Sequence, residues 1–324
     1  MKVFSTRVIT DLGVRLMQEA GIGVNQWEET RELSPEELIS KCRQHDALIV
    51  AGPIKVDGQL LEACQHLKVI AVHGVGYDNI DLSAANRFGI PIGNTPYVVD
   101  EATAETAFML MLMVARKALY QHKRILKGDW SFFEPTAHLG IELKGKTLGI
   151  FGLGNIGYRM AGLCRAAYDM KIIYCNRSRN FKAEQELRAE KVSFDKLLKE
   201  SDVLSVHSVL SNETRGVFNR EAFSAMKPSS IFINTARGAI HNEEDLTEVL
   251  IKNQIWGAGL DVTNPEPMDP DSPLLKLDNA TILPHIGTST QETREKMVRR
   301  VAENIIAGLK GERLPYVVNK EVYD

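Results

Sequence analysis

The stretch "KTLGIFGLGNIGYRMAGLCRAAY", residues 146–168, decides the fold. It has the pattern of an apolar strand, a glycine-rich turn and a helix. Gly152, Gly154 and Gly157 fill the spacing G-x-G-x-x-G. In that spacing the first glycine permits a tight turn, the second lets the backbone approach a pyrophosphate, and the third lets helix and strand pack closely. A second strand-like run, "KIIYCN", follows at 171–176. The segment therefore predicts a dinucleotide-binding unit with the phosphates at the helix N-terminus.

The end of that second run predicts which dinucleotide binds. An acidic residue, which would select NAD by holding a ribose diol, is expected near this point. The chain has Asn176, Arg177, Ser178 and Arg179 instead. Arginine offers a rigid fork of donors that suits a phosphate, and Asn176 and Ser178 can add hydrogen bonds. We therefore predict NADP(H) as the preferred cofactor, with NAD(H) as the alternative; the competing interpretation is that both arginines are solvated surface residues.

Strand-like runs alternate with amphipathic helices on both sides of this segment. For example, "DALIVAG" leads into "DGQLLEACQHL", and "KVIAVHGVG" leads into "LSAANRFG". This alternation predicts parallel sheets with helices on both faces. A long, mostly buried helix is expected at 101–120, where the second α/β unit begins. An amphipathic helix at 293–312 has no strand after it and could pack back on the first half.

Composition excludes several classes of protein. The 324 residues are 44% hydrophobic and 25% charged, with a net charge of −3, which is ordinary for a globular protein. The chain has no basic tail, so no nucleic-acid partner is expected. The longest apolar run, 107–115, is too short to span a bilayer, and the N-terminus lacks a signal-peptide core. No membrane partner is therefore expected. The four cysteines lack metal-ligand spacing, so we expect no metal site and reduced thiols in a cytoplasmic protein.

Three later segments each end an apolar run with polar residues. "SIFINTARG" carries Arg237, "GAGLDVTNPEP" carries Asp261 and Glu266, and "ATILPHIG" carries His285. Ligands of an open parallel sheet gather beyond the carboxyl ends of its strands. We therefore expect a guanidinium, a carboxylate and an imidazole to converge beside the nicotinamide.

These residue types suit the reduction of a 2-keto acid. Arg237 can hold a carboxylate or polarise a carbonyl, and His285 can protonate the carbonyl oxygen as hydride arrives from the cofactor. Glu266 would favour the charged imidazole and fix its orientation. Singly, each residue also has an ordinary structural explanation: an ion pair for Arg237, a solvated loop position for Glu266, and a cap for His285.

The chain resembles the D-2-hydroxyacid dehydrogenase family over essentially its whole length, and looks most like the glyoxylate reductase/hydroxypyruvate reductase branch. The matching motifs are "HGVGYDNID" (73–81), "GIFGLGNIG" (149–157), "INTARG" (233–238), "GLDVTNPEP" (259–267) and "LPHIGTST" (283–290). The resemblance implies an α/β enzyme with two doubly wound parallel-sheet domains and a cleft between them. The flavodoxin-like substrate-binding domain would comprise 1–100 and 289–324, and the Rossmann dinucleotide-binding domain 101–288.

The resemblance also implies roles for individual residues. Arg237, Glu266 and His285 would be catalytic, and Gly74, Val75 and Gly76 would join Arg237 in binding the substrate. The implied cofactor contacts are Thr106, Gly152, Gly154, Asn155, Ile156, Gly157, Asn176, Arg177, Ser178, Thr235, Ala236, Asp261, His285, Gly287 and Thr288.

The family resemblance further implies a homodimer formed around the dinucleotide-binding domains. Helix 101–120 and the aromatic side chains Trp130, Phe132 and Phe133 would lie in or near its contact, and local loop packing is the alternative for these aromatic side chains. The chain departs from many relatives at Ser208-Val209, which replaces Pro-Leu, and at His73, where small residues are common.

Several functions remain open on these grounds. The leading hypothesis is NADPH-dependent reduction of glyoxylate and hydroxypyruvate, small 2-keto acids that become D-2-hydroxy acids. Alternatives in the same family are a D-lactate-type enzyme, a 2-ketogluconate-type dehydrogenase and a phosphoglycerate dehydrogenase. A formate dehydrogenase is disfavoured because formate offers no carbonyl to protonate. A different class, a dinucleotide-sensing corepressor-like binding protein, reuses the same fold.

Overall fold

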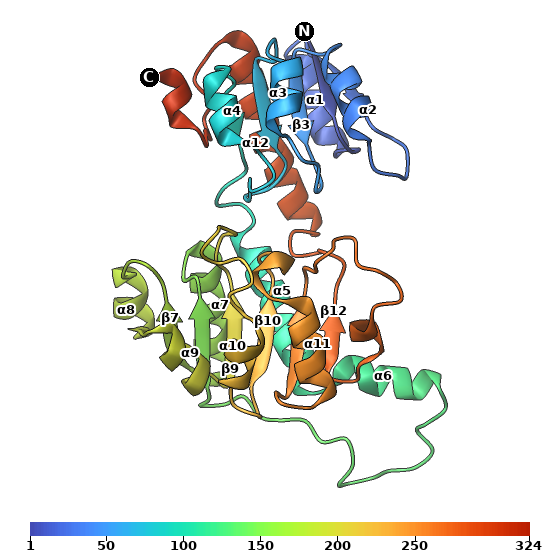
Figure 1. The fold of residues 1–324 in the computed structure, drawn as a ribbon, viewed down its shortest axis with the longest axis vertical. Coiled ribbons are helices and arrows are strands. Elements are labelled where there is room, and N and C mark those ends of the chain that lie inside the picture. The colour runs from blue at the N-terminus through green and yellow to red at the C-terminus, as the bar shows by residue number, and fades with distance from the viewer. The chain divides into compact units, whose positions relative to one another are not determined.

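The computed structural model describes every residue from 1 to 324. Contacts within the chain divide it into two compact units. We call Met1–Val99 together with Ser289–Asp324 the terminal unit, and Asp100–Thr288 the central unit. The terminal unit in Figure 1 accordingly combines blue elements from the start of the chain with red elements from its end.

The terminal unit is built on a five-stranded parallel sheet in the order β2-β1-β3-β4-β5, the order of flavodoxin-like folds. The last long helix, α12, packs against α1 and β4 of this sheet. Its elements are β1 (Lys2–Ser5), α1 (Asp11–Glu19), β2 (Gly23–Gln26), α2 (Pro35–Cys42), β3 (Ala47–Val50), α3 (Gly58–Ala63), β4 (Val69–Val72), α4 (Leu82–Arg87), β5 (Ile92–Gly93), α12 (Gln291–Lys310) and the 3₁₀ helix η3 (Lys320–Tyr323).

The central unit is built on a seven-stranded parallel sheet in the order β12-β11-β10-β9-β6-β7-β8. Its strands β8-β7-β6-β9-β10-β11 reproduce the Rossmann order. The elements are α5 (Asp100–Ala115), α6 (Ala118–Leu126), β6 (Thr147–Phe151), α7 (Asn155–Tyr168), β7 (Lys171–Cys175), α8 (Phe181–Leu187), β8 (Glu190–Lys191), α9 (Phe194–Glu200), β9 (Val203–Val206), α10 (Arg220–Ser224), β10 (Ile231–Asn234), η1 (Gly238–Ile240), α11 (Glu243–Ile251), β11 (Gly257–Leu260), η2 (Pro273–Lys276) and β12 (Ala280–Ile282).

The predicted fold class, α/β with two parallel sheets, is confirmed. The predicted helix 101–120 is wrong in its extent. Helix α5 ends at Ala115, and α6 begins at Ala118 after Lys117 adopts a left-handed backbone with φ of 52°. Apolar periodicity does not reveal such a break, because apolar residues continue on both sides of it. None of the helices combines the length and the apolarity that a membrane span requires.

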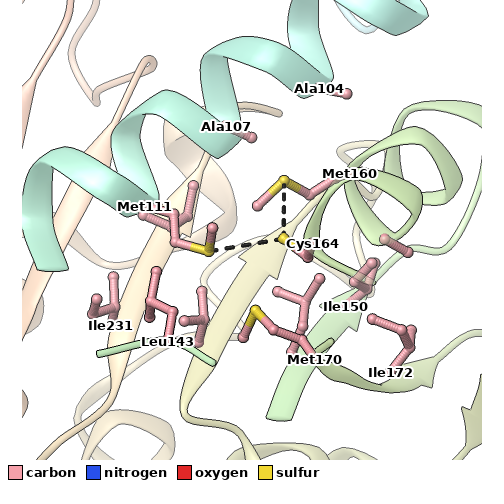
Figure 2. Close-up of a cluster of buried hydrophobic side chains, with 14 of the residues drawn as sticks. Ala104, Ala107, Met111, Leu143, Ile150, Met160, Cys164, Met170, Ile172 and Ile231 are labelled. Atoms are coloured by element: carbon pink, nitrogen blue, oxygen red, sulfur yellow. Dashed lines mark hydrogen bonds between the residues drawn. The ribbon is translucent and has the colours of Figure 1, made fainter. Parts of the chain in front are cut away.

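Small side chains let α5 approach α7 closely in the core of the central unit (Figure 2). Ala104 and Ala107 are fully buried on α5. The thiol of Cys164, on α7, contacts the sulfurs of Met111 and Met160 at 3.8 and 3.9 Å. Burial raises the pKa of this thiol. All four cysteines of the chain are free, which agrees with the prediction of reduced thiols.

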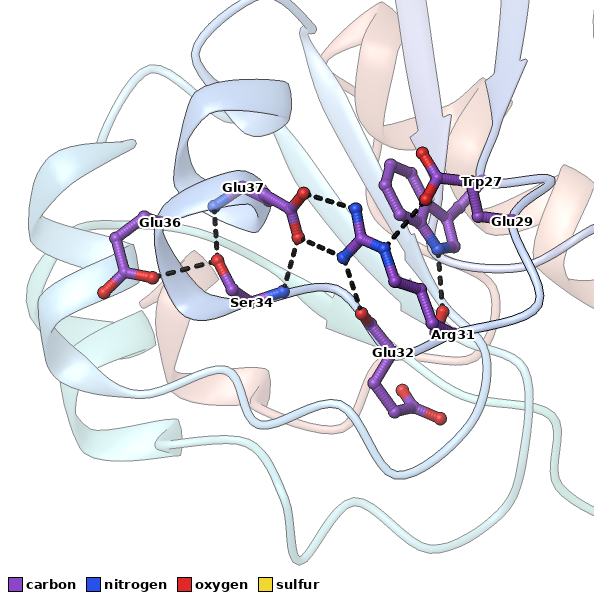
Figure 3. A network of polar contacts seen from close by, with 7 residues as sticks. All are labelled: Trp27, Glu29, Arg31, Glu32, Ser34, Glu36 and Glu37. Atoms are coloured by element: carbon purple, nitrogen blue, oxygen red, sulfur yellow. Dashed lines mark hydrogen bonds and ion pairs between the residues drawn. The ribbon is translucent and has the colours of Figure 1, made fainter.

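A polar network fixes the start of α2 in the terminal unit (Figure 3). Ser34 and Glu37 form a reciprocal capping box, in which each side chain accepts a hydrogen bond from the other residue's backbone N–H. Arg31 binds both carboxylate oxygens of Glu37, at 2.7 and 2.6 Å, and its carbonyl accepts from the indole N–H of Trp27 at 2.9 Å. These contacts order the loop between β2 and α2.

Candidate active site

The carboxyl ends of three neighbouring strands carry the predicted catalytic residues. Strands β10, β11 and β12 are adjacent and parallel, so their carboxyl ends lie along one edge of the sheet. Arg237 follows β10, Glu266 lies in the segment after β11, and His285 follows β12. All three therefore lie at the same edge of the central sheet.

Glu266 and His285 are in direct contact. Nδ1 of His285 hydrogen-bonds to Oε1 of Glu266, and the side chains of His285 and Glu266 are 46% and 31% exposed. No group of the chain bonds to Nε2 of His285, which leaves this nitrogen available to a ligand. His285 also has a left-handed backbone with φ of 54°. Non-glycine residues rarely adopt this conformation, and it is concentrated at functional sites.

Asp261 holds the turn that carries His285. Its carboxylate is buried and accepts hydrogen bonds from the backbone N–H groups of Ile286 and Gly287, both at 2.7 Å. Burial raises the pKa of Asp261, while these two donors and the nearby His285 oppose the rise. Asp261 is predicted from the sequence only as a cofactor contact, so this anchoring role is an addition from the structure. The detectable signal was a carboxylate placed directly after a buried strand.

Asn234 has the same function for the turn that carries Arg237. This buried residue ends β10; its amide donates to the carbonyl of Arg237 and accepts from the N–H of Ala236, both at 2.9 Å. The guanidinium of Arg237 donates to the carbonyl of Ala236 at 2.8 Å. Asn234 is not among the predicted site residues, because it shapes the backbone rather than touching a ligand.

The glycine turn has the geometry that a dinucleotide needs. Gly152 has a φ of 95°, and a Cβ there would lie 2.4 Å from the backbone nitrogen of Ser208. Around Gly154, in contrast, nothing lies within 4 Å of the same added atom, so a ligand can approach its backbone. Gly154 caps α7 without a side chain, which leaves the first N–H groups of the helix, from Asn155 onward, without a partner.

Unpartnered buried groups lie beside this turn. Strand β6 has β7 on one side and β9 on the other, which is the switch point where open α/β sheets bind ligands. Nδ1 of His207, Oγ of Ser208 and Oγ1 of Thr235 are buried without a hydrogen-bond partner, just beyond β9 and β10. Burial lowers the pKa of His207 to about 4, so the imidazole is neutral. Because unpaired buried polar groups are costly, these residues fit a polar cofactor.

Two predicted cofactor contacts already have partners within the protein. The amide of Asn176 accepts from the N–H of Leu153 at 2.6 Å and donates to its carbonyl at 3.1 Å, so it supports the glycine turn. The hydroxyl of Thr106 donates to the carbonyl of Ala102 one turn earlier in α5, at 3.0 Å. Ala236, Gly287 and Thr288 lie in the two turns described above, and their contacts with a cofactor stay predictions.

The two arginines beyond β7 differ in their surroundings. Arg179 is paired with Glu184 on α8, and this pairing raises the pKa of Arg179. Arg177 and Ser178 are exposed, and the guanidinium of Arg177 makes no ion pair. Lys191 approaches the same segment, since its ammonium group donates to the carbonyl of Arg177 at 3.0 Å. Arg177, rather than Arg179, is therefore free to meet an anion.

The predicted substrate loop lies in the terminal unit, directly after β4. Its carbonyl groups at Gly74 and Val75 accept hydrogen bonds from Thr95 and Asn94, at 3.0 and 2.8 Å. The adjacent His73 has its pKa lowered to about 4, by burial first and by the charge of Arg294 second. A neutral imidazole therefore borders this loop.

A Rossmann sheet with an open glycine turn, together with a histidine–glutamate pair at its carboxyl edge, defines the class of nicotinamide-dependent oxidoreductases. Comparison with known proteins identifies the family within this class. Residues 108–287 match the profile of the D-isomer specific 2-hydroxyacid dehydrogenase NAD-binding domain. The chain belongs to this family and is an NAD(P)-dependent oxidoreductase.

Individual relatives match this chain over nearly the full length of both proteins. A glyoxylate reductase of Thermococcus litoralis is 43% identical, over 99% of this chain and 97% of its own. A structure from Thermus thermophilus superposes with a TM-score of 0.91 at 38% identity, covering 98% of this chain and 100% of the other. An NADPH-dependent glyoxylate/hydroxypyruvate reductase from Sinorhizobium meliloti, in complex with NADP and malonate, gives 0.84 at 27% identity, with coverage of 99% and 97%.

Gly154 allows a direct test of dinucleotide binding. The change Gly154→Ala should leave the thermal stability of the cofactor-free protein near wild type, because the added methyl group meets only open space. It should weaken NADPH binding about tenfold or more, because the methyl group occupies the path of the pyrophosphate. Isothermal titration calorimetry with NADPH measures the effect. Unchanged affinity in a folded variant would show that the cofactor does not approach this turn.

Proposed function

We propose that this protein reduces small 2-keto acids, glyoxylate and hydroxypyruvate, to D-2-hydroxy acids with NADPH, and that His285 is the general acid. The observation that carries the proposal is the hydrogen bond between Glu266 and Nδ1 of His285, which leaves Nε2 unpartnered beside a dinucleotide-binding sheet. The glyoxylate reductases among the relatives support this choice of substrate.

Each residue of the set has one task in the proposed reaction. The reduced nicotinamide, when bound, supplies hydride to the carbonyl carbon. Arg237 orients the keto acid and polarises its carbonyl oxygen through charged hydrogen bonds. Nε2 of His285 gives its proton to that oxygen as charge develops there. Glu266 stabilises the charged imidazole before this transfer and fixes the ring, since it accepts from Nδ1.

The substrate carboxylate is proposed to bind at the loop formed by Gly74, Val75 and Gly76. We accordingly assign substrate binding to the terminal unit, residues 1–100 with 289–324, and dinucleotide binding to residues 101–288. Backbone N–H groups bind carboxylates well when they are fixed in direction and no protein acceptor competes for them. The relative from Sinorhizobium meliloti is in complex with malonate, which agrees with a site for small carboxylates.

A preference for NADPH is proposed from the segment after β7. The unpaired guanidinium of Arg177 and the hydroxyl of Ser178 are exposed there, and no carboxylate stands at the position that selects NAD. A 2′-phosphate carries the charge that such a pair would bind. The NADP found in the relative from Sinorhizobium meliloti agrees with this assignment.

Replacing the histidine should separate chemistry from binding. We expect His285→Ala to lower kcat with glyoxylate by about 10²–10⁴-fold, because the proton donor is lost, while NADPH binding changes little. Glu266→Gln should lower kcat less, since it keeps the ring in place but removes the carboxylate charge. Oxidation of NADPH is followed at saturating glyoxylate. A His285→Ala enzyme as fast as wild type would remove His285 from the mechanism.

The same assay with wild-type protein compares glyoxylate, hydroxypyruvate, pyruvate and 2-ketogluconate as substrates. Faster turnover of pyruvate or 2-ketogluconate would replace the proposed substrate with that of a D-lactate-type or a sugar-acid dehydrogenase. Failure to turn over any of the four would favour a dinucleotide-sensing binding protein.

The cofactor preference depends on one side chain. We expect Arg177→Ala to raise the KM for NADPH about tenfold and to leave the KM for NADH unchanged, because only NADPH carries the phosphate. Arg43→Ala, at an exposed arginine of the terminal unit, is the matched control and should change neither constant. A wild-type enzyme that prefers NADH would contradict the assignment.

A homodimer is proposed from exposed aromatic side chains in the segment after α6. Trp130, Phe132 and Phe133 are 66%, 67% and 84% exposed, and Leu126 is 73% exposed. Large apolar side chains that are exposed so close together in the sequence favour a protein contact. We expect a dimer in analytical ultracentrifugation that Phe133→Glu weakens, because a charge would have to be buried. A monomeric wild-type protein at assay concentrations would exclude the dimer.

A further inference from the structure

The loop after β4 presents three consecutive backbone N–H groups that have no acceptor. These belong to Gly74, Val75 and Gly76, all of which are partly buried. The N–H group of His73, just before them, is bonded to the carbonyl of Val50 at 2.8 Å. Partly buried N–H groups usually find a partner, so three in a row form a site for a small anion.

The direction of these N–H groups is set by the carbonyl groups next to them. A peptide unit is planar and trans, so its C=O and N–H point in opposite directions. The carbonyl of Gly74 accepts from the backbone N–H of Thr95 at 3.0 Å, which aims the N–H of Val75 away from Thr95. The carbonyl of Val75 accepts from the side-chain amide of Asn94 at 2.8 Å, which aims the N–H of Gly76 in the same manner.

Asn94 is itself held rigidly. It lies just after β5 and is 8% exposed. Its N–H donates to the carbonyl of Tyr316, and its carbonyl accepts from the amide of Asn304 on α12, both at 3.1 Å. Asn304 is fully buried and also accepts from the N–H of Tyr316 at 3.1 Å. The segments at 94 and 316 are therefore tied together by one buried amide on α12.

The surroundings of the loop favour a negative ligand. Arg294, in the first turn of α12, donates to the hydroxyl of Ser289 at 3.1 Å, and no carboxylate pairs with it. Its charge, added to burial, keeps His73 neutral. Nε2 of His73 and Oγ1 of Thr95 are buried without partners. The loop therefore lies among a cation and unsatisfied polar groups, with no protein anion bonded to its N–H groups.

We propose that Asn94 is a positioning residue for substrate binding: through the carbonyl of Val75 it aims the N–H of Gly76 at the substrate carboxylate. The inference rests on the proposed function and extends it to a residue outside the loop and outside the catalytic set. Loss of the amide would leave the carbonyl of Val75 without its donor, and the Val75–Gly76 peptide would be free to rotate. Such a rotation would turn the N–H of Gly76 away from the carboxylate, and the loss of one well-aimed hydrogen bond weakens binding by about tenfold.

The test compares Asn94→Ala with a control of the same chemistry. Asn86→Ala removes another partly buried amide of the terminal unit, whose oxygen accepts from Asn319 at 2.7 Å and which does not touch the loop. With NADPH-loaded protein, we expect Asn94→Ala to raise the KM for glyoxylate about tenfold, the equivalent of one hydrogen bond. It should keep kcat at saturation within about twofold and leave NADPH affinity unchanged. Asn86→Ala should alter none of these constants.

A binding measurement separates this inference from the proposed function. Calorimetric titration of the NADP-loaded protein with oxamate, a small carboxylate analogue of a keto acid, should show about tenfold weaker binding in Asn94→Ala. If wild-type protein reduces no keto acid yet binds oxamate in this Asn94-dependent way, the positioning role stands and the proposed reaction falls. Unchanged oxamate binding and unchanged KM in a folded Asn94 variant would overturn the positioning role.

A second variant at position 94 keeps the test decisive. Asn94→Ser keeps a polar side chain whose hydroxyl is too short to reach the carbonyl of Val75, and it decides the question if Asn94→Ala does not fold. The same rise in KM is expected for both variants. An equal rise in Asn86→Ala would mean that loosening of the whole unit is responsible, and would also overturn the proposal.

Discussion

The candidate site depends on the contact between the buried carboxylate of Asp261 and the backbone N–H groups of Ile286 and Gly287. Hydrogen bonds to a charged acceptor contribute about 1.5–3 kcal/mol each, which offsets part of the cost of burying the carboxylate and of holding His285 at a positive φ. The contact joins the ends of β11 and β12. The imidazole therefore takes its position from the sheet, the most rigid part of the unit, and Glu266 only has to complete its orientation.

Much of this arrangement follows from the sequence, because its signals are local. The glycine spacing after an apolar strand, and the polar residues ending β10 to β12, are visible in short windows, and the parallel order of the strands then places them on one edge. What could not be foreseen depends on chain segments that meet only in the fold. The amide of Asn176 turns back to Leu153, and the break at Lys117 lies between two segments that both have helical apolar spacing.

The two arginines after β7 also differ in a way that the sequence alone does not reveal. In the sequence, Arg177 and Arg179 are equivalent candidates for binding a phosphate. The fold distinguishes them, because α8 brings Glu184 against Arg179, and Tyr174 from β7 donates to the same carboxylate at 2.6 Å. The N–H of Asn180 bonds to the hydroxyl of Tyr174 at 2.8 Å. Arg179 therefore belongs to the packing of its own loop, whereas the guanidinium of Arg177 makes no ion pair.

The placement of the thiols gives each unit its own internal reporter. Cys42 and Cys64 are buried in the terminal unit, and Cys164 is buried against two methionine sulfurs in the central unit. A thiol reagent reaches these sulfur atoms only when the surrounding helices open. The order in which the three sites react in mild denaturant, followed by mass spectrometry, would thus show which unit loosens first, without any engineered label.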